Sequence, residues 1–413
     1  MPQTARHSPV TTPMPPALAR RLDGVPSSAV RDVLQFASRP GVLSLAGGMP
    51  APALLDLEGI AAATQRVLAE RGAQALQYGA TEGQPALRRQ LAQLMRMRGA
   101  AVDDGQLLVT GGSQQALDLV ARTLLDPGDR VAVENPTYLA ALQVLALAEC
   151  TLLTLEGDDD GARIDALVDG RLPTPKLVYL VPTFGNPGAT VLSLERRLRL
   201  LAWAARKHVW LLEDDPYGEL RYSGSRVPSL LALAREVPGA EDIVIHVSSL
   251  SKIMSPGLRI GWIVAPPALL PALVRSKQAL DLQTGTLAQE IAAQWLADDR
   301  LPQTLTRMRV GYLDRRDALV AALHTQFGDR LAFRAPPGGM FVWARFTDGR
   351  DTAALLPRAL AEGVAFVPGQ AFSAGTSARD ACHNAMRLGF ATLAPAQYGE
   401  AVARLRRACD RRS

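Results

Sequence analysis

The sequence is poor in cysteine, histidine and lysine, and each scarcity argues against some kinds of site or limits which residues can form one. Its three cysteines, Cys150, Cys382 and Cys409, are few, odd in number and far apart in the chain. This usage predicts a reducing compartment and offers no disulfide or metal framework. The five histidines show no ligand spacing, so we assign no metal site.

Long hydrophobic runs are also missing. The most apolar stretch, residues 139–155, contains Gln143 and Glu149, and a helix followed by a buried strand explains it better than a membrane span. The N-terminal residues are rich in proline and threonine and show no apolar segment after their first basic residues, which argues against a secretory signal. We therefore expect a cytoplasmic protein with a flexible arm over residues 1–24 and no membrane partner.

What the chain does contain is the composition of a large globular protein. Its 413 residues are 48% hydrophobic and 21% charged, so most of the chain is expected to fold around a sizeable core. The formal net charge is +5, but the arginines are scattered among aspartates and glutamates. That distribution predicts a mixed, solvated surface rather than a face for nucleic acid.

From about residue 105, short apolar runs alternate with amphipathic helical segments, which predicts a mostly parallel sheet covered by helices. One predicted helix has Ser193 as its N-cap and apolar residues at helical spacing, namely Leu194, Leu198, Leu201 and Ala205. In such sheets the ligand lies at the carboxyl ends of the strands. After about residue 302 the mixture of helices and strands predicts a smaller α+β domain.

Four predicted strand ends carry polar residues. Gly111, Gly112 and Ser113 lie between a strand and a helix, where free backbone N–H groups can bind a phosphate, although the same residues are common in an ordinary capped loop. The other three strand ends carry Asn186; Asp214 with Tyr217; and Ser249, Ser251 and Lys252 followed by Arg259.

Lys252 is unusual because the chain has only four lysines among many arginines. An amine can lose its proton, which arginine cannot do, so a lysine kept at a strand end predicts a nucleophile. Lys176 opens a strand after a proline-rich turn, and Lys207 and Lys277 lie in helical segments beside arginines. We expect those three to be surface charges.

An imine-forming amine, a phosphate site and a carboxylate that keeps a ring nitrogen protonated are the parts of a pyridoxal 5′-phosphate site. The sequence resembles class I/II aminotransferases of fold type I. Five motifs carry the resemblance, in this order: GGSQQALDL, the Asn-Pro after a strand, EDDPYGEL, SLSKIMSPGLRIGW and AMRLGF. It is most similar to the subgroup of aminoadipate, kynurenine and aromatic aminotransferases and MocR-type regulators. The resemblance runs from about residue 25 to the end.

The resemblance implies an α/β fold in which a mostly parallel seven-stranded sheet is sandwiched by helices, with a smaller α+β domain beside it. The implied boundaries are an N-terminal segment over residues 25–49 that packs with the small domain, a large cofactor-binding domain over residues 50–300, and a small domain over residues 301–413.

The resemblance also implies roles around the cofactor. Lys252 forms the covalent imine and, once substrate displaces it, moves the proton between the substrate and the cofactor. Asp214 pairs with the pyridine nitrogen, Tyr217 and Asn186 hydrogen-bond the phenolic oxygen, and Tyr138 stacks on the ring. The residues implied for the phosphate are Gly112, Ser113, Gln114, Ser249, Arg259 and, from the other subunit of a homodimer, Tyr78.

For the substrate, the resemblance implies that Arg387 binds the α-carboxylate as a planar bidentate donor, and that Gly48 and Asn186 also line the site. This chain departs from the family in reading Asn186-Pro187-Gly188, where relatives commonly place one residue between the proline and the glycine. The apolar residues Leu45 and Met49 favour substrates with apolar or aromatic side chains.

The function implied is transfer of the amino group of an L-α-amino acid to a 2-oxo acid, 2-oxoglutarate by family habit, in a ping-pong cycle. The alternatives are a lyase, decarboxylase or racemase that uses the same cofactor, or a regulator of the MocR type. Only some 25 residues precede the recognisable module, which is too short for a DNA-binding domain, so we expect no nucleic-acid partner.

Overall fold

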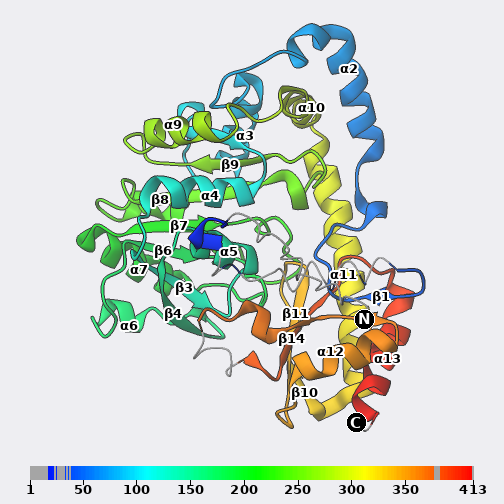
Figure 1. Cartoon of the computed structure of the whole chain (residues 1–413). Helices are drawn as coiled ribbons and strands as arrows, with labels where there is room; N and C mark the ends of the chain where they lie inside the picture. The colour runs from blue at the N-terminus through cyan, green and yellow to red at the C-terminus, as the bar shows by residue number, and fades with distance from the viewer. Residues whose placement is uncertain are drawn as a thin grey trace, which may run out of the picture.

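The computed structural model describes residues 17–22, 25, 33, 36, 39–375 and 382–411, which form two main sheets with helices around them (Figure 1). Most of the predicted arm, residues 1–24, lies outside the described residues. Much of the predicted segment 25–49 does too, but its strand β1 (Leu43–Ser44) pairs in parallel with β12 (Val364–Ala365), far away in sequence. The chain near residue 44 is therefore joined to the C-terminal part.

The larger sheet has the strand order β2-β9-β8-β7-β6-β3-β4-β5. Its strands are β2 (Leu107–Thr110), β3 (Arg130–Asn135), β4 (Thr151–Asp158), β5 (Gly161–Ala162), β6 (Leu177–Leu180), β7 (Trp210–Asp214), β8 (Val244–Ser249) and β9 (Gly261–Val264). The run from β8 to β4 is parallel, whereas β9 is antiparallel to both its neighbours. The mostly parallel sheet is confirmed, and it has eight strands instead of seven because the short β5 folds back on β4.

Helices cover both faces of this sheet because side chains of successive strand residues point to opposite faces. On one face, α4 (Ser113–Leu124), α5 (Leu139–Leu147) and α9 (Leu270–Leu280) share one apolar cluster with the strands. The other face carries two clusters. These involve α2 (Leu57–Ala75), α3 (Pro85–Met97) and α10 (Thr286–Ala297) near β2 and β9, and α6 (Asp165–Val168), α7 (Leu194–Lys207) and α8 (Leu230–Leu233) farther along.

The apolar stretch 139–155 divides into α5 and the start of β4, so it is a helix followed by a strand, as predicted. Because β4 lies near the edge of the sheet, most of its residues are only partly buried or exposed. Within the described ranges, none of the helices combines the length and the apolar character needed to span a bilayer.

Helix α7 confirms one prediction and corrects another. The Ser193 hydroxyl caps it by accepting a hydrogen bond from the backbone N–H of Arg196. The predicted apolar stripe is wrong at its first member, since Leu194 is 45% exposed. The buried face instead includes Arg197, whose guanidinium donates to the carbonyl oxygens of Leu192, Pro182 and Pro228. A buried arginine is tolerated there because the chain supplies its acceptors.

The smaller sheet contains β10 (Leu331–Phe333), β11 (Phe341–Phe346), β14 (Ala385–Gly389) and β13 (Val367–Pro368), in that order. It packs with α11 (Arg300–Phe327), α12 (Thr352–Ala361) and α13 (Tyr398–Asp410) around a separate apolar core. In Figure 1 these elements lie below the larger sheet, and the long yellow α11 runs past both parts. We propose that the large domain spans residues 50–300 and the small domain residues 301–413.

Candidate active site

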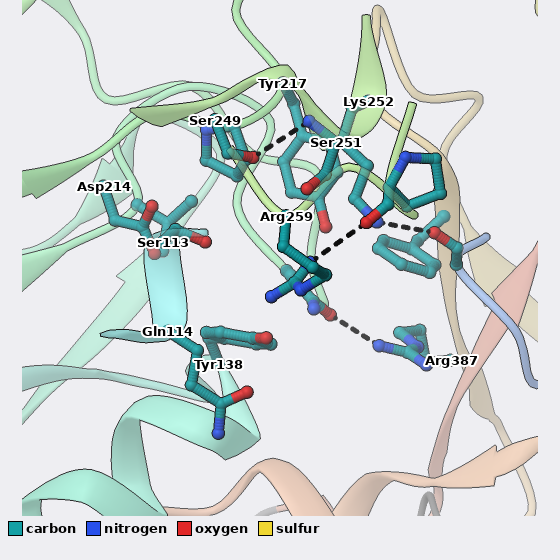
Figure 2. Close-up of a pocket in the computed structure, with 16 residues that line it drawn as sticks. Ser113, Gln114, Tyr138, Asp214, Tyr217, Ser249, Ser251, Lys252, Arg259 and Arg387 are labelled. Carbon is teal, nitrogen blue, oxygen red and sulfur yellow. Dashed lines mark hydrogen bonds between the residues drawn. The ribbon is translucent and has the colours of Figure 1, made fainter. Parts of the chain in front are cut away.

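A cavity of about 300 Å³ lies at the carboxyl ends of the parallel strands, and its lining comes from both parts of the fold (Figure 2). Loops after β6, β7 and β8 and the start of α4 form one side, and β11, β14 and the segment after β1 form the other. Every predicted site residue lines the cavity except Gly112 and Tyr78. The cavity lies where the rule for such sheets predicts a ligand, beyond the carboxyl ends of the strands.

Lys252 reaches the cavity from the short turn that follows β8. Its Nζ donates a hydrogen bond to the carbonyl oxygen of Gly48 at 2.9 Å. Burial, together with the positive charges of Arg387 and Arg259, lowers the pKa of Lys252 to about 8. This amine therefore loses its proton more readily than an ordinary lysine, and the neutral form is the nucleophile.

The other lysines follow the prediction in two cases out of three. Lys176 and Lys207 are exposed, but the Lys277 side chain is 0% exposed, so its description as a surface charge is wrong. Its Nζ pairs with both carboxylate oxygens of Asp281, at 2.8 and 2.9 Å. Lys277 lies in the last turn of α9, and Asp281 follows the end of that helix. This i,i+4 ion pair explains its burial, and of the four lysines Lys252 alone lines the cavity.

Asp214 ends β7 with its carboxyl group buried at the cavity wall. Burial, with a smaller contribution from the charges of Asp215 and Glu213, raises the pKa of Asp214 to about 7. Its Oδ2 accepts a hydrogen bond from the hydroxyl of Tyr179 at 3.1 Å. Its Oδ1 is buried and has no hydrogen-bond partner among the described residues. Such a group is costly to leave unpaired, so the site is built for a cationic or N–H donor at Oδ1.

The start of α4 forms an anion site. Ser113 and Gln114 line the cavity in the first turn of the helix, where backbone N–H groups are free, and Ser249, Ser251 and Arg259 line the same cavity. Figure 2 shows Ser113 and Gln114 extending from the start of α4. Together these lining residues offer amide, hydroxyl and guanidinium donors to a phosphate.

Gly112 lies immediately behind this anion site. Its φ of +97° is a conformation that favours glycine, and a Cβ there would lie 2.5 Å from Nη2 of Arg259. The Arg259 guanidinium in turn donates to the carbonyl oxygen of Gly111 at 3.1 Å. Gly112 therefore shapes the loop and lets the arginine approach it, without lining the cavity itself.

Arg387 occupies the opposite end of the cavity, on β14. Its Nη1 donates to Oδ1 of Asn186 at 2.9 Å and its Nη2 donates to the carbonyl oxygen of Ala46 at 2.7 Å. Its guanidinium carbon lies 4.1 Å from the ring centre of Phe341 and 4.9 Å from that of Phe372. Burial lowers the pKa of Arg387 to about 10, so it remains a cation at neutral pH, and a planar guanidinium is a suitable donor for a carboxylate.

Aromatic rings make the walls between these ends. Tyr138 lies just before α5, where burial raises its pKa to about 12, and Tyr217 packs edge-on against Phe341 with ring centres 6.1 Å apart. Asn186 lines the cavity despite the altered position of Gly188 in its loop. The cavity thus has aromatic side chains between the donors at the start of α4 and the guanidinium of Arg387.

Four lining residues were not predicted, namely Val181, Pro216, Pro256 and Phe341, and Ser251 was noted at its strand end without a role. Ser251 and Pro256 lie inside the motif around Lys252, so their proximity could have been inferred from it. Phe341 is far along the chain in an ordinary apolar strand, which gives no local signal. Conversely, Leu45 is buried in the core of the smaller part and Met49 is 55% exposed, and neither lines the cavity. They give no support to a preference for apolar substrates.

Tyr78 lies outside the cavity. It follows α2 in a surface loop and is 78% exposed. The backbone N–H of its neighbour Gly79 hydrogen-bonds the side chain of Gln283, which places this loop beside the exposed Leu282.

The residues present fit pyridoxal 5′-phosphate. The orphaned Oδ1 of Asp214 suits a protonated ring nitrogen, the anion site suits the phosphate, and the amine of Lys252 suits the aldehyde. Tyr138 and Val181 lie on the same cavity, where a ring can be enclosed.

Comparisons with known proteins agree with this fit. Aminotransferase class I and II is the family that matches, over residues 42–405. The aromatic-amino-acid aminotransferase 1 of Thermococcus litoralis is 40% identical over 389 residues, which cover 92% of this chain and 91% of that protein. The crystal structure of LysN, the alpha-aminoadipate aminotransferase of Thermus thermophilus, superposes with a TM-score of 0.86 at 38% identity and covers 95% of this chain and 96% of that one.

A more distant relative is the HTH-type transcriptional regulator TauR of Rhodobacter capsulatus, 35% identical over 321 residues that cover 77% of this chain and 63% of the regulator. The LysN structure was solved with N-(5′-phosphopyridoxyl)-L-leucine, so that neighbour holds the phosphopyridoxyl group which the present cavity fits. On the family match, the close relatives and the fold, this chain belongs to the class I and II aminotransferases, enzymes that use pyridoxal 5′-phosphate.

Proposed function

We propose that this aminotransferase moves the amino group of an L-α-amino acid to a 2-oxo acid, with 2-oxoglutarate as the acceptor, in a ping-pong cycle. The observation that carries the proposal is that the amine of Lys252 and the guanidinium of Arg387 line one cavity. Pyridoxal 5′-phosphate, when bound, takes up the amino group of the first substrate and supplies a ring that withdraws electrons. One cavity with one carboxylate site then serves the two substrates in turn.

The positions of the chain's own residues support the following roles. Arg387 orients the substrate through its α-carboxylate, which directs the α-carbon toward Lys252. The Lys252 amine would take the proton from that carbon and pass it to the bound cofactor, and in the second half of the cycle it would carry a proton the opposite way, to the α-carbon derived from the 2-oxo acid. Asp214 supports the pyridine nitrogen, Tyr217 and Asn186 donate to the phenolic oxygen, and Tyr138 covers the ring. Asn186 also receives a hydrogen bond from Arg387, so the two ends of the site are coupled.

The first test is the absorbance of the purified holoenzyme during each half of the cycle. Adding L-glutamate is expected to convert the visible band of the bound cofactor to the near-ultraviolet band of its amino form, and 2-oxoglutarate is expected to restore it. The names of the relatives suggest further donors, namely aromatic amino acids, L-2-aminoadipate and L-leucine. A visible band that persists with every donor, or release of ammonia or carbon dioxide, would contradict the proposal and indicate a lyase or decarboxylase.

We also propose a homodimer in which Tyr78 reaches the phosphate site of the partner subunit. The proposal is supported by the exposure of Tyr78 and its apolar neighbours, Leu76 at 70% and Leu282 at 48%. Large exposed apolar side chains that lie close together are typical of interaction surfaces. We further propose that the enzyme works in the cytoplasm, because its cysteines are few and odd in number.

Sedimentation velocity is expected to give a mass about twice the 44.2 kDa of one chain. Mixed dimers of Tyr78→Ala and Lys252→Ala subunits are expected to regain activity that neither variant has alone, because one of their two sites keeps both groups. A monomeric enzyme with full activity, or mixed dimers without recovery, would contradict the shared site.

A further inference from the structure

The two oxygens of the Asp214 carboxylate have different surroundings. Oδ2 accepts a hydrogen bond from the hydroxyl of Tyr179 at 3.1 Å, whereas Oδ1 has no partner within the described part of the chain. Asp214 lines the cavity, but Tyr179 does not. The carboxylate is therefore shared between a fixed donor of the protein on one side and the ligand site on the other.

We propose that Tyr179 is a positioning residue for the cofactor, whose hydroxyl holds Oδ2 of Asp214 so that Oδ1 is oriented to bind the pyridine nitrogen. The inference rests on the proposed role of Asp214. A carboxylate with one oxygen fixed cannot rotate away from its ligand, and such supporting hydrogen bonds set the precision of a binding site. Nothing in the sequence around Tyr179 pointed to this role, since the residue lies inside an apolar strand.

The fold gives Tyr179 a rigid place from which to act. In the parallel pairing of β6 with β7, Tyr179 lies opposite Leu212, two residues before Asp214 and on the same face of the sheet. Its ring is 1% exposed and packs in the apolar cluster formed with α4 and α5. Burial raises the pKa of the Tyr179 hydroxyl well above its usual value, so this group remains a hydrogen-bond donor throughout the range in which Asp214 titrates.

Removing the hydroxyl is expected to favour the protonated form of Asp214. Burial and the neighbouring acids raise the pKa of Asp214, and the hydrogen bond from Tyr179 lowers it. Without that bond the pKa of Asp214 rises further, so the carboxylate takes up its proton at a higher pH and becomes a poorer partner for a protonated ring nitrogen. The other titratable groups that face Asp214 are Glu134, Tyr138, Glu213, Asp215, Tyr217 and His246.

The test is Tyr179→Phe, which keeps the ring and removes only the hydroxyl. Titration of the apoenzyme with pyridoxal 5′-phosphate is expected to show an affinity about 10-fold weaker or more, the size typical of a hydrogen bond to a charged group. The pH below which the affinity falls is expected to move upward. Tyr398→Phe is the matched control, because Tyr398 is a fully buried tyrosine whose hydroxyl binds the carbonyl oxygen of Phe390, away from the cavity. It is expected to leave both measurements unchanged, and thermal melting of each apoenzyme checks the fold.

A double-mutant cycle with Asp214→Asn separates this inference from the proposed role of Asp214. If Tyr179 acts through Asp214, Tyr179→Phe weakens cofactor affinity in the wild type and has little effect in the Asp214→Asn background. Equal losses in both backgrounds would assign Tyr179 to packing alone and overturn the inference. The inference is also overturned if Tyr179→Phe binds the cofactor with unchanged affinity while Asp214→Asn binds it more weakly. If Asp214→Asn itself binds the cofactor normally, the proposed role of Asp214 fails, and the inference fails with it.

Discussion

Lys252→Ala is expected to abolish amino transfer while the chain remains folded. The variant lacks the amine that we propose as the proton carrier at the substrate α-carbon, and general acid–base catalysis contributes roughly 10²–10⁴-fold to enzymatic rates. We therefore expect a loss of at least about 10³-fold, because the covalent step is lost too. Steady-state assays with L-glutamate and 2-oxoglutarate measure the loss.

The same substitution is not expected to destabilise the apoenzyme at neutral pH. Burial lowers the pKa of Lys252 to about 8 in the folded chain, below the value of about 10.4 for a free lysine side chain. At pH 7 the unfolded chain therefore binds this proton more readily than the folded chain does, so the amine opposes folding there, and the penalty disappears as the pH rises past the unfolded value. Thermal melting at pH 7 checks this expectation.

Borohydride reduction of the wild-type holoenzyme, followed by peptide mapping, identifies the amine that is bonded to the cofactor. We expect the pyridoxyl group on Lys252 and none in Lys252→Ala. The informative control is Lys277→Met. Lys277 is also a lysine and is more deeply buried than Lys252, but its amine is paired with Asp281 and does not line the cavity. A pyridoxyl group on Lys176, Lys207 or Lys277 of the wild type would refute the assignment of Lys252.

Arg387→Ala is expected to lower kcat/KM for amino acids by about 30-fold or more, with cofactor binding retained. A hydrogen-bonded charge pair in a buried site is worth about 2–5 kcal/mol, and the substrate carboxylate loses it entirely. The guanidinium is a cation at neutral pH because even its lowered pKa is about 10. Kinetics with L-glutamate measure the first quantity, and titration of the apoenzyme with pyridoxal 5′-phosphate measures the second.

Arg387→Lys serves as the control, because it keeps the charge but loses the planar fork that donates to Asn186 and Ala46. We expect it to recover part of the lost kcat/KM. If Arg387→Ala instead loses the cofactor while its apoenzyme melts normally, Arg387 belongs to the cofactor site and its proposed role is wrong.

The positions of the site residues could be predicted where local chain order carries the information. Ser113, Asp214 and Lys252 each follow or end an apolar strand, and parallel strands bring their carboxyl ends to one edge of the sheet. Arg387 comes from a different sheet, and its place was implied by the resemblance to the aminotransferases instead of by any periodicity. Motif order and strand order thus determined the fold class, the cofactor and most of the lining.

Burial and contacts between distant segments were decided by the tertiary structure alone. Lys277 and Lys207 both occupy helices beside arginines, yet of these two only Lys277 is buried. The packing of α9 on α4 covers its side chain, and Asp281 pairs with its amine. Phe341 and Tyr179 are apolar strand residues by every local measure, and only the cavity wall and the hydroxyl contact with Asp214 distinguish them. The sequence by itself determined which chemistry is present. The packing determined which lysine lines the cavity and which oxygen of Asp214 has no partner among the described residues. Both pKa and orientation depend on neighbours that sequence spacing does not specify.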